Sequence, residues 1–324
     1  MRRFLTAFVL LLLAAAGYVA WRLQDRPSLA TWPPLPAERP AGPAVTVRFL
    51  GVSSLVVSDG TTTLVTDGFV SRPPLWRTLV GRIAPDELTI DWALDRASLR
   101  HADAVFVVHS HYDHAMDAPL VAARTGAVLV GSESTANVAR GVRFPDDRMR
   151  VVTPGEPMRF GAFEVVCLES EHFPHGMAMG TITEPLVPPA RAMAYREGGS
   201  YSILVRHPLG TLLVQGSAGW KDGALAGQHA DVVLLGLAGL ATQDASYTAQ
   251  YLREVVDAVG ATLVVPIHWD DFTRPLAEPL VPMPRLLDDL SVTLRRLMTH
   301  LGPRGVQIAF LPAFEPVPLL PPRR

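Results

Sequence analysis

The stretch Val105 to His114, which reads VFVVHSHYDH, has residue types and a spacing that can bind a metal ion. Four apolar residues, all β-branched or aromatic, run directly into three histidines and an aspartate. His109 and His111 are two residues apart and therefore point to the same side of an extended strand end. Asp113 and His114 follow at the turn into the next helix. This gathering of imidazole and carboxylate groups predicts a metal site at the end of a buried strand.

Two later strands also lead into a histidine. FEVVCLES (163 to 170) is followed by His172, and TLVVPIHW (262 to 269) contains His268. A histidine at the end of a strand is in the right place to be a further metal ligand. His175 lies three residues beyond His172 and competes with it for this role. Asp67 ends an earlier short β run, where a functional role and a plain Asp-Gly turn explain it equally well.

The composition favours one large α/β domain or two small ones. The chain has 324 residues, of which 48% are apolar, and its formal net charge is −2. Charges of both signs are mixed along the chain without a basic stripe, so nothing indicates a nucleic-acid partner. Cys167 is the only cysteine, which excludes an internal disulfide and favours a buried apolar role.

The N-terminus carries a segment suited to the membrane. Residues Phe4 to Trp21 are apolar apart from Thr6 and follow Arg2 and Arg3. At about 1.5 Å per residue they would span about 27 Å, close to the hydrocarbon core of about 30 Å. We expect an uncleaved anchor that keeps its arginines in the cytoplasm and the rest of the chain on the periplasmic or extracellular side. The alternative is a signal peptide cleaved near Ala14 to Ala16, which would give a secreted protein.

The chain divides into an anchor or signal segment (1–22), a Pro-rich linker (23–43) and a globular domain (44–324). The linker contains WPPLP at 32–36 and is too rich in proline for helix or sheet. We expect a stiff, extended spacer that holds the globular part off the bilayer.

From residue 45 onward, β runs followed by alternating strands and helices predict a layered α/β sandwich and not a barrel or bundle. Three runs between 45 and 68 suggest an antiparallel meander. Later strands are expected at 127–131, 151–152, 163–170, 201–207, 210–216, 231–236 and 262–269, and helices at 76–80, 115–125, 132–140, 246–259 and 284–300. The segment 173–199 is long and rich in proline and methionine, which favours a lid or substrate wall over a disordered excursion. We assign no structure to the tail 311–324.

The sequence HSHYDH resembles the HxHxDH signature of the metallo-β-lactamase superfamily. Within that superfamily the chain is similar to the group of ascorbate-6-phosphate lactonases and zinc phospholipases that hydrolyse N-acyl-phosphatidylethanolamine. The supporting sequences are DGFVSR at 67–72, GGS at 198–200 and HWDDF at 268–272, and the resemblance covers residues 45 to about 290. It implies a four-layer αββα metallo-β-lactamase sandwich.

The resemblance also implies two zinc ions, each held by three side chains. The first ion would be bound by His109, His111 and His172, and the second by Asp113, His114 and His268. Asp67 would orient ligands from behind. Two positions depart from the family, because Ser217 stands where an aspartate usually bridges the metals and GVSS at 51–54 lacks a frequent histidine. A single ion is therefore the alternative to two, and iron or manganese are alternatives to zinc.

Together these features predict a metal-dependent hydrolase. Zinc lowers the pKa of bound water to about 7, and the hydroxide would attack an ester, lactone or phosphodiester, lipid-like substrates included. Asp113 would both bind metal and accept or return a proton. One alternative is an iron-dependent redox enzyme of the same fold, which His111 disfavours because the diiron reductases carry glutamate there. Another is a degenerate membrane-tethered binding module, with Ser217 as the sign of decay.

Overall fold

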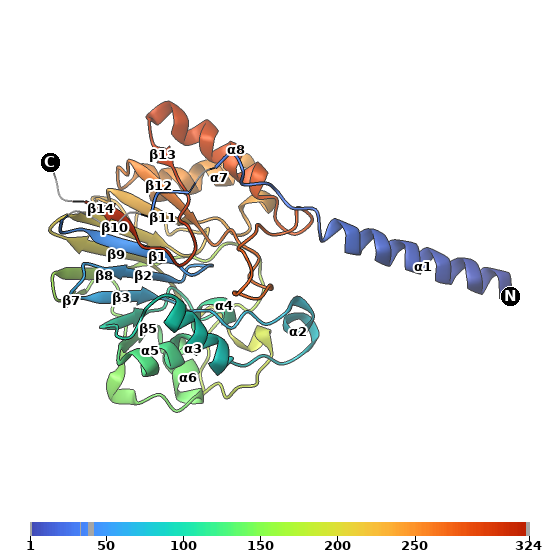
Figure 1. Ribbon diagram of the computed structural model, residues 1–324, viewed down its shortest axis with the longest axis horizontal. Coiled ribbons are helices and arrows are strands. Elements are labelled where there is room, and N and C mark those ends of the chain that lie inside the picture. The colour runs from blue at the N-terminus through green and yellow to red at the C-terminus, as the bar shows by residue number, and fades with distance from the viewer. Residues whose placement is uncertain (1, 33, 38–41, 322–324) are drawn as a thin grey trace.

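The computed structural model describes residues 2–32, 34–37 and 42–321, and its globular part consists of two facing seven-stranded sheets (Figure 1). The first sheet has the order β14 (Val317–Leu320), β1 (Val45–Phe49), β2 (Leu55–Ser58), β3 (Thr63–Thr66), β4 (Ala104–Phe106), β5 (Val128–Gly131) and β6 (Met149–Val151). The second has the order β13 (Gln307–Ile308), β12 (Leu263–Ile267), β11 (Val232–Gly236), β10 (Gly210–Gln215), β9 (Ser200–His207), β8 (Phe163–Ser170) and β7 (Pro157–Phe160).

Helices cover the outer faces of both sheets. The first sheet is covered by α3 (Glu87–Arg96), α5 (Ala118–Thr125) and α6 (Glu133–Gly141), and the second by α7 (Ala245–Leu252) and α8 (Leu290–Leu301). Short 3₁₀ turns lie at Asp146–Arg148, Ala192–Ala194, Leu240–Thr242 and Gly302–Arg304, and a π-helical turn at Arg253–Asp257 follows α7. The four layers confirm the predicted αββα sandwich.

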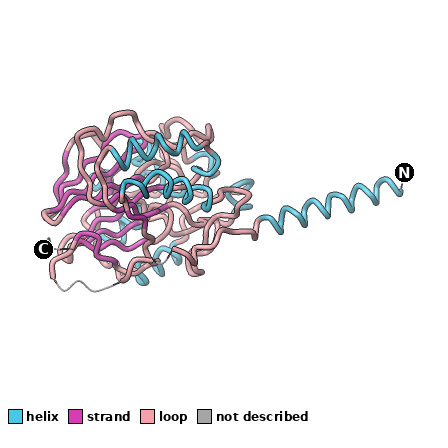
Figure 2. The backbone as a smooth tube through the Cα atoms, turned by 90° about the horizontal axis from the view of Figure 1, so that it is seen from above, coloured by secondary structure: helices cyan, strands magenta, loops and turns pink. Residues whose placement is uncertain are grey.

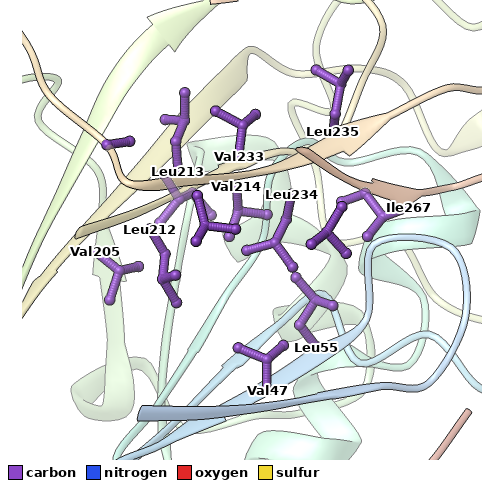
Figure 3. Packing of buried hydrophobic residues seen from close by; sticks show 14 of the residues in the cluster. Val47, Leu55, Val205, Leu212, Leu213, Val214, Val233, Leu234, Leu235 and Ile267 are labelled. Carbon is purple, nitrogen blue, oxygen red and sulfur yellow. The ribbon is translucent and has the colours of Figure 1, made fainter. Parts of the chain in front are cut away.

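Apolar side chains from both sheets fill the space between them. Figure 3 shows Val47 and Leu55 of the first sheet opposite Leu212 and Leu234 of the second, all of them buried. Each strand in this layer presents alternate side chains to the interior, because successive residues of a strand point to opposite faces. A second apolar cluster joins the first sheet to its outer helices.

The connections explain why polar residues gather at one edge. β1, β2 and β3 form the predicted antiparallel meander, whereas β3, β4 and β5 are parallel neighbours, as are β10, β11 and β12. Parallel strands place their carboxyl ends at the same edge of a sheet. Asp67 follows β3, His109 comes shortly after β4, Ser217 follows β10 and His268 follows β12. The short helix α4 (Tyr112–Ala115) begins at this edge.

Two helix boundaries differ from the prediction. The helix expected at 284–300 begins only at Leu290, because the Asp289 carboxylate caps it by accepting from the Ser291 N–H. The helix expected at 115–125 is divided into α4 and α5 around Asp117. The buried Asp117 carboxylate accepts hydrogen bonds from the backbone N–H groups of Val70 and Ser71, which draws it toward the loop after β3.

The expectation of an unstructured tail is wrong. Residues 317–320 form β14, which pairs antiparallel with β1 at the edge of the first sheet. An edge strand tolerates the proline at position 318, since one side of the strand needs no sheet hydrogen bonds. The last residues, 322–324, lie outside the described part of the chain.

The described part of the linker runs along the globular domain. The Leu35 N–H donates to the Phe310 carbonyl, and the Trp32 ring meets the Phe310 ring edge-on at a centroid distance of 5.9 Å. Position 33 and positions 38–41 of the predicted linker lie outside the described residues. In its described part, the linker therefore does not act as the expected spacer that holds the domain away from the membrane.

The N-terminal helix α1 (Arg2–Arg22) projects away from the domain (Figures 1 and 2). Its span Phe4–Arg22 is long and apolar enough to cross a membrane, and none of that span is buried. It is the one such helix among the described residues.

Candidate metal centre

Three imidazoles from two distant segments converge at the edge where the strands end. His109 and His111 follow β4, and His172 follows β8 on the opposite sheet. Their ligand atoms lie within 4.8 Å of one another, an arrangement that could hold a metal ion. The rings of His109 and His111 each lie 4.6 Å from the ring of His172. We call this group the imidazole triad.

A second group of three lies beside the first and includes a carboxylate. Asp113, His114 and His268 also bring their ligand atoms within 4.8 Å of one another. The Asp113 Oδ2 lies 3.3 Å from His268 Nε2 and 3.7 Å from His114 Nε2. The His109 and His114 ring centroids are 3.9 Å apart, so the two groups are neighbours. We call the second group the carboxylate triad.

Asp67 is hydrogen bonded to His114 of the carboxylate triad, on the side of the ring that faces away from the site. Its backbone is left-handed, with φ of +54°, a conformation that Asp and Asn adopt more readily than most residues. One carboxylate oxygen accepts from the Val108 N–H at 2.9 Å and the other accepts from His114 Nδ1 at 2.8 Å. Because the side chain is fully buried, these bonds fix the orientation of the His114 ring.

A buried ion pair that the sequence reasoning did not single out positions His268. Arg72 pairs with Asp270 at 2.5 Å, and both side chains are shielded from solvent. The other Asp270 oxygen accepts from the Val52 N–H at 2.8 Å, and the Val52 carbonyl accepts from the His268 N–H at 2.6 Å. These contacts support the left-handed backbone of His268, whose φ is +51°. The DGFVSR and HWDDF sequences contain both charged residues and were the available signal.

The hydrogen bonds of His111 and His172 leave one nitrogen of each of these two rings free for a metal. His111 Nε2 faces the Ala178 carbonyl at 3.2 Å and His172 Nδ1 faces the Phe173 carbonyl at 2.7 Å, so these nitrogens carry the proton. The opposite nitrogen of each ring then bears a lone pair directed into the site. A lone pair on that side is what metal coordination requires.

Two further observations test whether a cation fits. His109 Nε2 and His111 Nδ1 face each other at 3.1 Å, a separation at which two lone pairs repel unless a cation or proton lies between them. His109 Nδ1 and His268 Nδ1 are buried without a hydrogen-bond partner among the described residues. Five imidazoles and one carboxylate are a donor set that suits zinc, iron or manganese. The residues therefore fit a divalent metal centre.

The imidazole triad is neutral at neutral pH. Burial lowers the pKa of His111 to about 4 and that of His172 to about 3, and the neighbouring histidines add to the shift in His172. Burial and the charge of His114 hold the pKa of His109 well below its usual value. A neutral imidazole is the form that binds metal, so these rings need not lose a proton first.

In the carboxylate triad, the pKa shifts favour the charged forms of the side chains. Burial opposes ionisation of Asp113, but His114 and His268 outweigh it and hold the pKa of Asp113 far below its usual range. Burial also lowers the pKa of His114, yet the carboxylates of Asp67 and Asp113 outweigh it and raise that pKa. Asp113 thus supplies a negative charge to this triad, and that charge attracts a cation.

The two uncertain residues of the sequence analysis lie beside the triads and outside both. The Ser217 Oγ accepts from the Phe173 N–H at 3.0 Å, which ties the loop after β10 to the loop carrying His172. The His175 ring lies 4.6 Å from the His172 ring, and its Nδ1 accepts from the Met177 N–H at 2.8 Å. His172, and not His175, is the residue that joins the imidazole triad.

A cavity of about 270 Å³ opens directly above both triads. Four members of the triads line it: His111, Asp113, His172 and His268. Its walls are largely apolar and come from the loops 173–199 and 268–272 and from α4; they include Tyr112, Phe173, Met177, Met193, Tyr195 and Phe272. The long loop after β8 therefore forms a wall of this cavity, as the lid or substrate-wall interpretation predicted.

Comparisons with known sequences find a matching family and related proteins. A family model described as "Beta-lactamase superfamily domain" matches residues 74–269, which is more than half of the chain. An Escherichia coli strain SMS-3-5 protein described as "Probable L-ascorbate-6-phosphate lactonase UlaG" is 25% identical over 212 residues. That alignment covers 62% of this chain and 58% of the relative, so the chain spans less than two thirds of the relative's length.

Solved structures share the fold at low sequence identity. The metallo-beta-lactamase fold protein YhfI from Bacillus subtilis matches with a TM-score of 0.51 and 12% identity, covering 84% of this chain and 98% of that one. The diiron beta-hydroxylase CmlA from Streptomyces venezuelae matches with a TM-score of 0.52 and 16% identity, covering 87% of this chain and 55% of that one. At these identities the likeness concerns the fold alone.

Proposed function

The chain belongs to the metallo-β-lactamase superfamily, and from this membership we propose that it is a metal-dependent hydrolase acting on an ester or lactone bond. The observation that carries the proposal is the pair of donor triads side by side at the base of a cavity. We propose His109, His111 and His172 as ligands of one ion and Asp113, His114 and His268 as ligands of the other, with zinc as the metal.

A divalent metal held there would lower the pKa of a water molecule and polarise the substrate oxygen. The chain's own contribution begins with Asp113, whose ionised carboxylate lines the cavity and would accept a hydrogen bond from a water molecule bound there. That contact orients the water and gives its proton an acceptor. Asp67 acts through His114, because its bond to His114 Nδ1 fixes the ring so that Nε2 is directed toward the site.

The cavity wall favours an uncharged or weakly charged substrate. None of the described residues that line it is lysine or arginine. A phosphate-bearing substrate usually meets arginine or lysine, which neutralise its charge in a buried site. The apolar wall favours instead an acyl ester or lactone with a sizeable apolar part. Phosphodiesters remain a comparison class in the assay.

We further propose that α1 is a membrane anchor. Its span Phe4–Arg22 meets the length and composition of a single crossing, and Arg2 and Arg3 precede it. Under the positive-inside rule the arginines stay in the cytoplasm, which places the globular domain on the periplasmic or extracellular side. Cleavage of α1 would give a secreted enzyme with the same site.

The test compares two histidines three positions apart that both face the cavity. Full-length protein is stripped of metal with a chelator, reloaded with zinc, manganese or iron, and assayed on acyl esters, lactones, phosphodiesters and β-lactams. His172→Ala should lose bound metal and hydrolytic activity. The loss should exceed the about 10- to 100-fold that is typical when a residue behind a metal ligand is replaced. The matched control His175→Ala should keep its metal. Full activity of His172→Ala with an empty site would contradict the proposal.

Iron retained through aerobic purification, with a visible absorption band, would support the redox alternative.

A further inference from the structure

The end of α1 is fastened to the wall of the metal-site cavity. Four residues beyond α1, Arg26 pairs with the buried Asp271 at 2.7 Å and donates to the Pro282 carbonyl. The neighbouring Asp25 carbonyl accepts from the Arg285 N–H at 2.9 Å. Asp271 directly precedes Phe272, which lines the cavity. These contacts of residues 25 and 26 therefore hold the end of α1 beside the cavity wall.

The length of chain between α1 and this attachment limits how far the cavity can lie from the membrane. Arg26 lies only four positions after Arg22, the last residue of α1. A fully extended chain covers at most about 3.6 Å per residue, or about 14 Å in total. Figure 1 shows α1 leaving the domain on the side where α2 (Leu75–Val80) and α4 lie.

An apolar surface surrounds the cavity mouth on that same side. We define the apolar rim as five exposed side chains, Trp76, Leu79, Val80, Met177 and Met193. Met177 and Met193 also line the cavity. No residue of α2 is buried, and Trp76, Leu79 and Val80 are exposed. Exposed apolar groups gathered around a cavity mark a surface that contacts something apolar.

Backbone and side-chain contacts connect α2 to the cavity walls. The Thr78 side chain of α2 lies close to the Tyr112 hydroxyl, and Tyr112 lines the cavity. Just beyond α2, Ile83 and Ala190 exchange two backbone hydrogen bonds of 2.7 and 2.9 Å, which joins this segment to the loop that carries Met193. The rim is thus a single surface built from α2 and the loop 173–199.

Arginines accompany the apolar side chains of the rim. Arg77, Arg82 and Arg191 are exposed, and the Arg77 guanidinium lies 5.3 Å from the Trp76 ring centroid. Tryptophan and arginine on an apolar face are typical of segments that lie in the interfacial layer of a bilayer, where arginine meets anionic head groups.

We propose that the apolar rim rests on the lipid bilayer spanned by α1, so that the cavity opens toward the membrane surface and receives amphiphilic substrates from it. The bilayer is the occupant because α1 ends within a few residues of the cavity wall. The inference rests on the proposed membrane span of α1, but its test needs neither bound metal nor hydrolytic activity.

The experiment compares two methionines that are equally exposed. Met193 in the rim and Met298 on α8 are each 53% exposed, and α8 lies on another flank of the domain from α2 (Figure 1). Met193→Cys and Met298→Cys, made in the full chain, are labelled with a fluorophore whose emission shifts to the blue in apolar surroundings. Cys167 does not compete for the label, because it is buried and burial raises its thiol pKa to about 12.

The labelled proteins are reconstituted into vesicles of phosphatidylcholine and phosphatidylglycerol, and their flotation with the vesicles checks the span of α1 separately. We expect the label at position 193 to shift to the blue and to be quenched by lipids carrying a quencher near the head group, while the label at 298 stays in water. Leu79→Cys on α2 provides a second rim label if Met193→Cys does not fold, with the same expected result.

Three outcomes would overturn the proposal. Protein that floats with vesicles while its rim label remains in water shows that α1 spans the bilayer without docking the rim. Protein that does not float removes the premise itself. A blue shift that rises with protein concentration in the absence of vesicles identifies a second copy of the chain as the occupant.

Discussion

The two donor triads have equal numbers of ligand groups but differ in charge and in support. The imidazole triad consists of three rings, and burial keeps each ring's pKa low. The carboxylate triad includes the ionised Asp113 and is backed by the buried Asp67. Ser217 supplies no charge where the family usually has a bridging aspartate. The carboxylate triad therefore attracts cations by the charge of Asp113, and the imidazole triad by its lone pairs alone.

Acid should destabilise the metal-free protein chiefly through the imidazole triad. The folded pKa of His111, about 4, and that of His172, about 3, lie below the usual value of 6.5, so their contribution is present above pH 6.5 and lost as pH falls toward 4. At about 1.4 kcal/mol per pKa unit, His111 alone accounts for about 3 kcal/mol. The measurement is urea unfolding of the metal-free protein from pH 7 to pH 4.

Variants separate the two triads in the same experiment. His172→Asn should flatten the loss of stability in acid. His114 should act in the opposite direction, because its folded pKa is raised and its contribution is present below pH 6.5 and lost as pH rises. His101→Ala, at an exposed position, is the control. A pH profile that His172→Asn leaves unchanged would contradict the assignment of buried neutral imidazoles.

Removing the carboxylate should weaken metal binding most. Asp113→Asn keeps the size of the side chain but removes the only carboxylate among the six donors. We expect the affinity of the carboxylate triad for zinc to fall by about 100-fold or more, which exceeds the loss expected when a residue behind a metal ligand is replaced. Titration of metal-free protein against a competing chelator measures this, with His172→Asn as the partner that affects the other triad. Equal losses at both triads would remove the distinction between them.

Asp67→Asn should have an intermediate effect, confined to the carboxylate triad. Asparagine adopts the left-handed backbone of this position, and its side-chain oxygen can still accept from the Val108 N–H. What is lost is the carboxylate acceptor for His114 Nδ1. We expect about 10- to 100-fold weaker metal binding. Unchanged zinc affinity in a folded variant would show that Asp67 acts only as a turn residue.

Ser217→Asp should strengthen metal binding, in contrast to the two preceding substitutions. The new carboxylate retains an acceptor for the Phe173 N–H and adds a negative charge to the cavity lining. We expect tighter binding of the more weakly held ion, by about 10-fold, equivalent to about 1.4 kcal/mol. Ser217→Asn is the neutral control of the same size. An equal gain with asparagine would assign the effect to packing instead of charge.

Much of the fold and the site could be predicted because short sequences carry the information locally. The cluster at 109–114 follows an uninterrupted apolar run, and His172 and His268 lie within two residues of the end of a strand with a clear apolar pattern. Gly126 ends α5 in a left-handed conformation, as a glycine after a helical pattern predicts. These features depend on neighbours within a few residues.

What could not be predicted depends on contacts between distant segments. The proline-rich tail reads as irregular, yet it completes the first sheet by pairing with β1. α3 has the weak amphipathic pattern of a half-exposed helix, although its cap, Asp86, accepts from the Leu88 and Thr89 N–H groups. The Arg72–Asp270 pair joins residues almost 200 positions apart. Nothing local specifies such partners.

The most direct test of the account is the stoichiometry and affinity of divalent metal bound by the full chain. Metal-free protein is titrated with zinc while calorimetry records each binding event and elemental analysis counts the ions retained. The account predicts two ions per chain, bound with unequal affinity, and loss of the tighter event in Asp113→Asn. A chain that retains no zinc, or whose zinc binding is indifferent to Asp113→Asn and to His172→Asn alike, would contradict it.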